Sequence, residues 1–310
     1  MVGHRRGSGE NCRVHLLGMV AQRLQVSLLE SAERPDVIEL FDDEFIFSRG
    51  RTISLARRFS DVFASGDCFI VVGEVAAQLV SALVVRSFIW IEGDRQWRGA
   101  MIGLVCTKSQ YRGNGYASEL LAVAERRCRA LGHDFAVLWT ANHTIYKRLG
   151  WIAADRGTLG TCRTSLGGTS PDLPAAAFQT TTHRIHALHE ARGSQRVKRR
   201  LANYQHMLPP AERLLFFLER SSYALSGEYR RTGYVYDLAG SNAHMPRLWD
   251  KLAGSFDNLY VNVERESAVH CWLQQRTPLV WKEQSLTMWK PLRSDPVPFG
   301  QWYIPFMDRI

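Results

Sequence analysis

The chain of 310 residues lacks the long apolar run that a membrane-spanning helix requires. Such a helix needs about 18 consecutive apolar residues, and the longest candidate, Ala76 to Val85, is interrupted by Gln78. A short apolar patch from Val14 to Ala21 is followed by no clear cleavage site for a signal peptide. We therefore expect a cytoplasmic protein that does not bind a membrane, with residues 1–22 as a flexible N-terminus.

Cysteine motifs are also missing. The six cysteines lie far apart in the sequence, none forms C-x-x-C, and none has the spacing of a zinc site. With 45% hydrophobic residues, a chain of this length can bury a large core without cross-links. The sequence therefore predicts free thiols in a reducing compartment and no metal, and the even number of cysteines leaves disulfides as the alternative.

Acidic residues are in the minority, since 30 acidic against 39 basic residues give a formal net charge of +9. This excess favours an anionic partner. A basic run, Arg196 to Arg200, lies on a predicted helix and is either a solvated face or a docking surface for RNA or protein. No aromatic-rich strand motif of the kind that stacks bases is present, so nucleic acid is not the expected partner.

Two common phosphate-binding motifs are absent, but a glycine-rich turn is present. The chain has no G-x-x-x-x-G-K-[ST], and Ser118 stands where G-x-G-x-x-G requires its third glycine. Gly113 and Gly115 follow the uncharged segment 101–107, typical of a buried strand, and precede a helical pattern from Ala117 to Leu131. Free N–H groups at a helix start bind phosphate; the alternative is a tight connection without a ligand.

Residues around this turn match a wider pattern. The segment Arg112 to Ala117 fits R/Q-x-x-G-x-G/A and is preceded by Val-x-Thr-x-x-x-Tyr at the end of the predicted strand. Downstream lie Asn142 and a Tyr-x-x-x-Gly-aromatic segment from Tyr146 to Trp151. In both segments the chain resembles the GNAT acyltransferase superfamily. The resemblance implies that fold, acetyl-CoA or another acyl-CoA as co-substrate, and an amine as acceptor.

The same resemblance implies roles for individual residues. The amides of the turn would bind the pyrophosphate of coenzyme A, and Arg112 would add positive charge. The strand end would offer backbone groups to the pantetheine arm. Asn142 would help fix the pantetheine or adenine side of the cofactor. The predicted cofactor-binding residues are Val105, Cys106, Thr107, Arg112, Gly113, Asn114, Gly115, Tyr116, Ala117 and Asn142.

Tyr146 is the predicted general acid. A phenol with a pKa near 10 can protonate a leaving thiolate of comparable basicity, and the alternative is a core aromatic residue. The strand before the turn holds no acid, so the general base stays open among Glu92, Asp94, the cluster Asp42 to Glu44, and His143. Cys106 is either a nucleophile or, as we prefer, a buried structural thiol.

The order of the predicted elements indicates an α/β fold with a mixed sheet. Strands are predicted at 24–29, 68–73, 79–91, 99–107 and 135–139, and helices at 36–47, 51–63, 117–131 and 142–149. A turn is predicted at 73–74, a linker at 157–174, helices at 192–207 and 211–220, and strands at 229–238, 259–263 and 280–289.

We divide the chain into an acyl-CoA-binding catalytic domain, residues 23–175, and a second domain, residues 176–310. The second would be a degenerate GNAT-like unit, or an unrelated α/β unit, that shapes the acceptor site. The expected function is N-acyl transfer, with acetyl as the default group, to a small-molecule amine in a ternary complex by a monomer or homodimer. The alternatives are a non-catalytic acyl-CoA sensor and a protein- or RNA-directed N-acetyltransferase.

Overall fold

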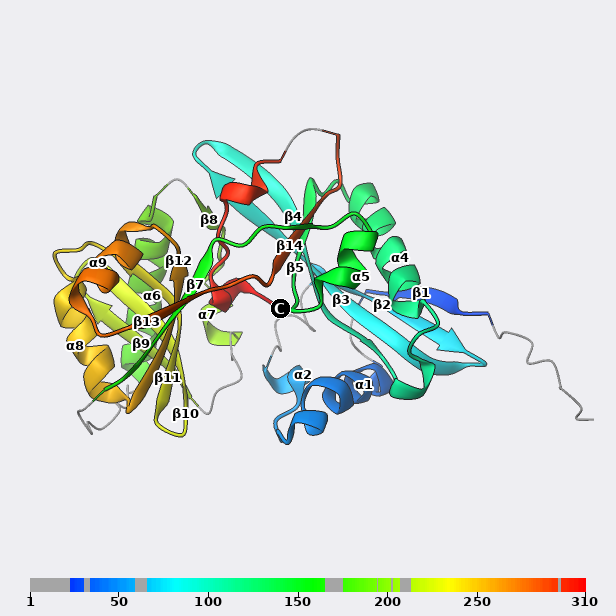
Figure 1. Cartoon of the computed structure of the whole chain (residues 1–310), viewed down its shortest axis with the longest axis horizontal. Coiled ribbons are helices and arrows are strands. Elements are labelled where there is room, and N and C mark those ends of the chain that lie inside the picture. Colours follow the sequence, from blue (N-terminus) through cyan, green and yellow to red (C-terminus); the bar gives the residue numbers. More distant parts are fainter. Residues whose placement is uncertain are drawn as a thin grey trace, which may run out of the picture.

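Two β-sheets stand side by side in the computed structural model (Figure 1). It describes residues 23–30, 34–58, 66–164, 175–193, 195–201, 203–206, 213–294 and 297–310. The first sheet has eight strands in the order β1-β2-β3-β4-β5-β14-β6, with β8 on β3, and the second has six in the order β13-β7-β12-β11-β10-β9. The predicted mixed α/β fold is confirmed, while the N-terminal segment 1–22 lies outside the described residues.

The first sheet starts as an antiparallel meander that ends in a crossover helix. Its strands are β1 (Gln25–Leu29), β2 (Cys68–Val75), β3 (Gln78–Glu92) and β4 (Arg95–Thr107). Helix α4 (Tyr116–Ala130) then crosses one face of the sheet, and β5 (Phe135–Trp139) returns parallel to β4. This confirms the predicted order of antiparallel strands, central helix and parallel strand.

Helices cover both faces of this sheet. The apolar face of α4 packs on one side, whereas α1 (Pro35–Phe45) packs Val37, Leu40 and Phe41 on the other. The smaller elements are η1 (Phe47–Arg49), α2 (Leu55–Arg58), η2 (Ser109–Tyr111), α5 (His143–Arg148) and β6 (Ile152–Ala153). Before residue 157 no described element differs in type from the prediction, although the β2–β3 turn lies at Ala76 and Ala77. Of the helix predicted at 51–63, residues 55–58 are helical and residues 59–63 lie outside the described part of the chain.

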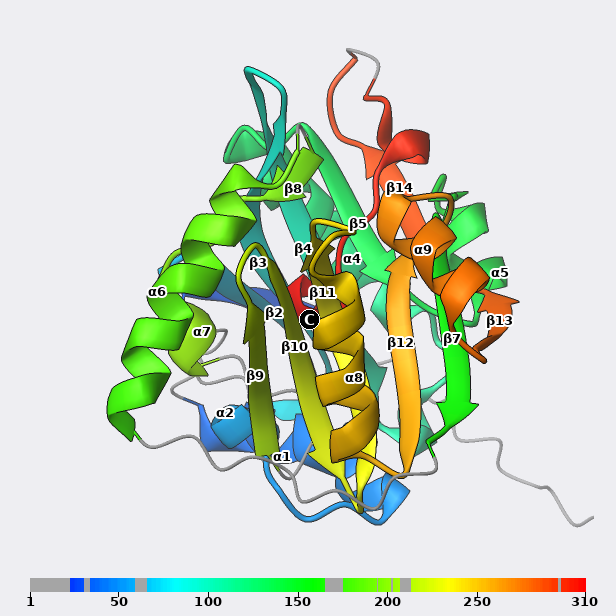
Figure 2. The same cartoon turned by 90° about the vertical axis from the view of Figure 1, so that its left-hand side faces the viewer.

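The second sheet repeats the same order of elements. An antiparallel meander, β9 (Arg213–Glu219), β10 (Ser222–Tyr229) and β11 (Thr232–Gly240), leads into α8 (Met245–Ser255), and β12 (Asn258–Glu264) returns parallel to β11. Helices α8 and α9 (Ala268–Arg276) cover one face (Figure 2). Helices α6 (Ala175–Ala191) and α7 (Asn203–His206) cover the other.

Three short strands each join the sheet on the other side of the domain boundary predicted at residue 175. β7 (Gly157–Arg163) joins β12 and β13 (Val280–Glu283) in the second sheet. In the opposite direction, β8 (Gln195–Val197) pairs with β3, and β14 (Thr287–Pro291) lies between β5 and β6 in the first sheet. The domain boundary at residue 175 therefore stays a prediction, since strand pairing crosses it repeatedly.

Four predicted elements are wrong. The linker at 157–174 begins with β7, and its residues 165–174 lie outside the described part of the chain. The helix predicted at 192–207 contains strand β8, and only its last described part is helical, in α7. The helix predicted at 211–220 contains strand β9 instead, and residues 211–212 lie outside the described part of the chain. β9 has core on both faces, Leu215 and Phe217 on one and Phe216 on the other, so its apolar run has no strand periodicity. The strand predicted at 280–289 is divided between two sheets.

The last residues of the chain connect the two sheets, and the C-terminus lies between them (Figure 1). Trp302 joins an aromatic cluster on the first sheet, where its ring lies 5.3 Å from Trp90 and 5.1 Å from Phe135. A few residues later, in η4 (Phe306–Asp308), Phe306 stacks on Tyr236 of the second sheet at 5.1 Å. η3 (Phe299–Gln301) precedes this bridge. None of the helices described here has both the length and the apolar composition needed to cross a membrane.

A buried ionic network holds this bridge in place. Arg199 contacts the carboxylates of Asp308 and Asp237 at 2.7 Å each, and all three side chains are 1% exposed. Arg192 adds a second contact to Asp237 at 2.7 Å, so two arginines balance two aspartates. Burial alone would raise the pKa of Asp237, but Arg192 and Arg199 hold it below its ordinary value. The network therefore stays charged at neutral pH.

We predict that Arg199→Ala lowers the free energy of unfolding by about 3–5 kcal/mol, because it leaves the Asp308 carboxylate buried without a partner. Lys251→Ala is the control, since Lys251 forms an ion pair with Glu219 at the surface and should cost much less. Urea unfolding of both variants measures the difference. Equal losses would contradict the structural role of the network.

Candidate active site

The turn before α4 requires its glycines for backbone reasons. Gly113 and Gly115 have φ values of 86° and 82°, in the left-handed region that side chains disfavour. A Cβ atom added at either position would meet no atom within 4 Å, so the turn is open on its outer side. Gly115 is the N-cap of α4. The backbone is thus held in a conformation that a ligand can approach closely.

Several amides of this turn make no hydrogen bond within the described chain. Within the described chain, the N–H groups of Tyr111, Arg112, Ser118 and Glu119 donate to backbone oxygens, whereas those of residues 113–117 have no acceptor. They lie at the positive end of α4, a helix of 15 residues. Five successive free donors at a helix N-terminus form a site for an anion such as a pyrophosphate.

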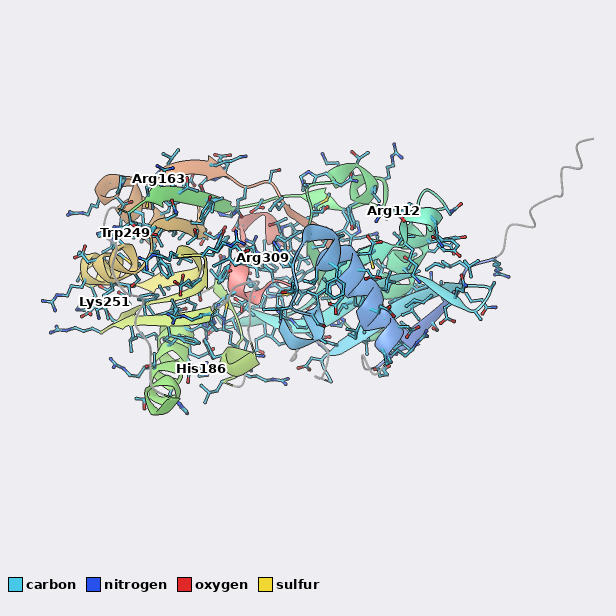
Figure 3. The ribbon with its side chains drawn as sticks, turned by 90° about the horizontal axis from the view of Figure 1, so that it is seen from below. Arg112, Arg163, His186, Trp249, Lys251 and Arg309 are labelled. Carbon is cyan, nitrogen blue, oxygen red and sulfur yellow. The ribbon has the colours of Figure 1, made fainter. Side chains whose placement is uncertain are left out.

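Arg112 is held by two contacts beside the turn. Its Nε donates to the carbonyl oxygen of Thr107 at 3.0 Å, and its Nη2 lies 2.5 Å from Oε2 of Glu44. Figure 3 shows Arg112 on the side of the molecule where α1 lies. Glu44, one of the candidate bases, is therefore the counter-ion of a predicted cofactor-binding residue.

Strands β4 and β5 separate where β4 approaches the turn. Their parallel pairing runs only from Gly99–Phe135 to Met101–Val137. Three residues later β4 has a bulge at Leu104, whose φ is 51°. Among the described strands, β4 pairs only with β3 beyond the bulge, so its edge toward β5 keeps unpaired backbone groups. These groups precede the free amides of the turn by a few residues along the chain.

Tyr146 lies on α5, just beyond the end of β5. Its ring is half-buried and packs edge-on against Trp151, with the ring centres 6.1 Å apart. Burial raises the pKa of its hydroxyl, which has no hydrogen-bond partner among the residues that the structure describes. His143 lies one turn earlier on the same helix, and its buried Nε2 is also without a partner there. Asn142 is exposed at the N-cap.

This geometry agrees with the comparison to known families. Residues 25–154 match the family model described as an acetyltransferase (GNAT) domain. These residues form a GNAT acetyltransferase domain. Comparison with curated proteins finds no significant match to the chain.

Solved structures extend the likeness in fold beyond the GNAT domain. A GCN5-related N-acetyltransferase from Kribbella flavida has a TM-score of 0.63 at 19% identity, over 86% of this chain and 72% of that one. A probable N-acyltransferase from Enterococcus faecalis has a TM-score of 0.66 at 14% identity, over 87% and 72%. A GCN5-related N-acetyltransferase from Anabaena variabilis has 0.65 at 13% identity, over 87% and 73%. At these identities the likeness concerns the fold alone.

The structure separates the candidate bases of the GNAT domain. Glu92 and Asp94 lie at the far end of β4, whose 13 residues span about 40 Å. Glu92 accepts hydrogen bonds from the indoles of Trp97 and Trp302 there. In α1, Asp42 is buried and accepts the N–H of Leu55 at 2.7 Å, and Asp43 is exposed. His143 is the candidate that lies on the same element as Tyr146.

Cys106 lies on β4 but faces the core under α1. Burial raises the pKa of its thiol to about 12, and the negative charge of Glu44 adds to the effect. The thiol is therefore protonated at neutral pH and is a poor nucleophile. This geometry supports the structural role that we preferred for Cys106.

Two features of the site have no signal in the sequence. The left-handed backbone of Leu104 is unusual for a leucine, so no residue type marks the bulge. The ion pair of Arg112 joins residues 68 positions apart, and only the packing of α1 brings them together. Among the described residues, no group of three or more His, Cys, Asp or Glu side chains is arranged to bind a metal ion.

We predict that Cys106 in the folded protein resists alkylation by iodoacetamide at pH 8, because its thiol is buried and protonated. The exposed Cys271 is the internal control and should react readily. Peptide mass spectrometry before and after unfolding in urea measures both. Labelling of Cys106 at the rate of Cys271 in the folded state would show that the thiol is accessible.

Proposed function

We propose that this protein is an acyl-CoA-dependent N-acyltransferase that transfers an acyl group, acetyl by default, to an amine of a small molecule. The observation that carries the proposal is the row of free amides at residues 113–117, next to the opening between β4 and β5 of the GNAT domain. A pyrophosphate fits the first feature and an extended pantetheine arm fits the second.

The chain's own residues would bind the co-substrate in three places. The amides of Gly113, Asn114, Gly115, Tyr116 and Ala117 bind the pyrophosphate, and Arg112 supplies positive charge. The strand end from Val105 to Thr107 offers backbone groups to the pantetheine arm and an N–H to the thioester carbonyl. Asn142, exposed at the start of α5, contacts the other side of the arm. When the pyrophosphate binds, Arg112 either contacts it together with Glu44 or breaks its ion pair with Glu44.

The transfer then proceeds by direct attack in a ternary complex. The amine nitrogen forms a bond to the thioester carbonyl carbon, and the oxyanion is stabilised by backbone N–H. The C–S bond breaks as the intermediate collapses, and Tyr146 donates its proton to the departing thiolate. Burial raises the pKa of Tyr146, so its hydroxyl is protonated at neutral pH. His143 accepts the amine proton directly or through water.

The second sheet would contribute to the acceptor side. Tyr234 and Tyr260 stack with ring centres 5.1 Å apart, and Tyr260 is 37% exposed. Burial raises the pKa of Tyr234, and the positive charge of Arg51, which follows η1 of the GNAT domain, opposes this shift. A stacked aromatic pair suits the apolar body of a small acceptor. We accordingly retain residues 176–310 as the part that shapes the acceptor site.

The basic run from Arg196 to Arg200 gives no support to an RNA-docking surface. Arg199 is buried between two aspartates, Arg196 lies 3.3 Å from Glu190, and Arg200 lies 2.8 Å from Asp67. Most of the charge of the run is therefore balanced within the protein. A small-molecule acceptor fits the structure better than a nucleic acid.

The test is a panel of small amines, assayed for release of coenzyme A with acetyl-CoA and with longer acyl-CoAs. We expect amine-dependent release with at least one acceptor. Tight coenzyme A binding without any turnover across a broad panel would favour the acyl-CoA sensor. Failure to bind coenzyme A at all would overturn the proposal.

We predict that Tyr146→Phe lowers kcat by about 10²-fold or more while leaving the affinity for coenzyme A unchanged, because only the phenolic hydroxyl that donates the proton is removed. Tyr229→Phe is the matched control, since that ring is 42% exposed on the second sheet. Steady-state kinetics and calorimetric titration measure the two effects. Full turnover by the Tyr146→Phe variant would assign the acid role to another group.

A further inference from the structure

A cavity of about 360 Å³ opens beside β3, away from the cofactor turn. Along one edge of β3, pairing with β2 stops at Arg86 and pairing with β8 starts at Trp90, and no other described strand pairs there with the residues between them. Residues Ser87, Phe88 and Ile89 form one wall of the cavity, and the chain after β8 forms another. Arg98 of β4 also lines the cavity. It lies nine residues before Thr107, which borders the cofactor turn, or about 30 Å along the strand. The cavity is therefore separate from the candidate active site.

Positive charge dominates this cavity. Among the residues that the structure describes, its lining holds five cationic side chains against the two carboxylates of Asp67 and Asp308. The five are Arg86, Arg98, Lys198, Arg199 and Arg200.

Both carboxylates already form ion pairs with arginines. Asp308 pairs with Arg199, and Asp67 pairs with Arg200 at 2.8 Å. The side chains of Arg86, Arg98 and Lys198 form no ion pair among the described residues, although the carboxylate of Asp134 accepts the backbone N–H of Arg98 at 2.7 Å. Three cationic side chains without an ion-pair partner there therefore line one small space.

Arg86 is more buried than Arg98 and Lys198, which are both exposed. Its guanidinium is half-buried, yet its contacts in the described structure are the carbonyl oxygen of Asp308 and the sulfur of Met101. Neither contact carries a negative charge, and both use Nη2, so the other N–H donors of the guanidinium are available to a ligand. His133 on the same wall adds no charge, because burial lowers its pKa and its imidazole is bonded to Cys128 and Ser87.

We propose that this cavity binds a small molecule that carries a phosphate group. The fork of Arg86 suits phosphate oxygens, and Lys198 and Arg98 supply further charge at the mouth. The volume exceeds that of inorganic phosphate, which leaves room for a small organic part. Through Arg86 and Asp308 the ligand would touch the network that joins the two sheets, so its binding would stabilise the whole protein.

The experiment measures the melting temperature of the full chain with inorganic phosphate, glycerol 3-phosphate or succinate, at constant ionic strength. Each titration is run with and without coenzyme A, and any stabilisation by phosphate that survives in the cavity variants below is assigned to the turn at residues 113–117. We expect both phosphate compounds to raise the melting temperature in a saturable way and succinate to do so less. Equal stabilisation by succinate would reject the preference for phosphate.

Two variants locate the effect. Arg86→Gln and Lys198→Gln should each weaken the apparent affinity for phosphate by about 10-fold, because each removes a charge from the cavity. Lys198 is exposed, so its variant keeps the fold even if Arg86→Gln does not. Lys282→Gln, an exposed lysine on β13, is the control and should change nothing. Unchanged phosphate affinity in Lys198→Gln and Arg86→Gln, or no stabilisation of the wild-type chain, would overturn the proposal.

Discussion

The position of Arg199 between Asp237 and Asp308 is the contact on which the rest of this structure depends. These residues come from the chain after β8, from β11 of the second sheet and from the last turn of the chain. Each carboxylate has lost its water and relies on a neighbouring guanidinium. Once the three are together, Trp302 and Phe306 can dock on opposite sheets. A balanced buried charge thus determines how the two sheets are joined.

The two sheets repeat one plan, but only one copy has the features of a cofactor site. Both contain three antiparallel strands, a crossover helix and a parallel strand. In the first copy, glycines with positive φ leave the start of α4 free of acceptors. In the second, Pro246 stands in the first turn of α8 and removes an N–H, and the N–H groups of His244 and Met245 donate to Ser241. The second copy therefore has a helix start but not the open row of amides.

Local patterns in the sequence predicted much of the GNAT domain and less of the remainder. Strand β5, helix α4 and the glycine turn have periodicity and residue types that do not depend on distant contacts. β9 was predicted as a helix because both of its faces are covered. Arg199 was assigned to a basic run on a predicted helix, either a solvated face or a docking surface, because nothing nearby in the sequence shows its buried partners. At the candidate site, Tyr146 and the turn were identifiable, whereas the bulge at Leu104 and the contact of Glu44 with Arg112 depend on tertiary packing.

The place of β14 in the first sheet has a consequence for synthesis on the ribosome. β5 pairs with β4 over only three positions, and its other edge is covered by residues 287–291. Those residues emerge about 150 positions after β5, which at 5–20 residues per second means roughly ten seconds or more. During that time the nascent sheet exposes an apolar strand edge, a hazard for aggregation. The first half of the chain thus completes its sheet only when nearly all of the second half has been made.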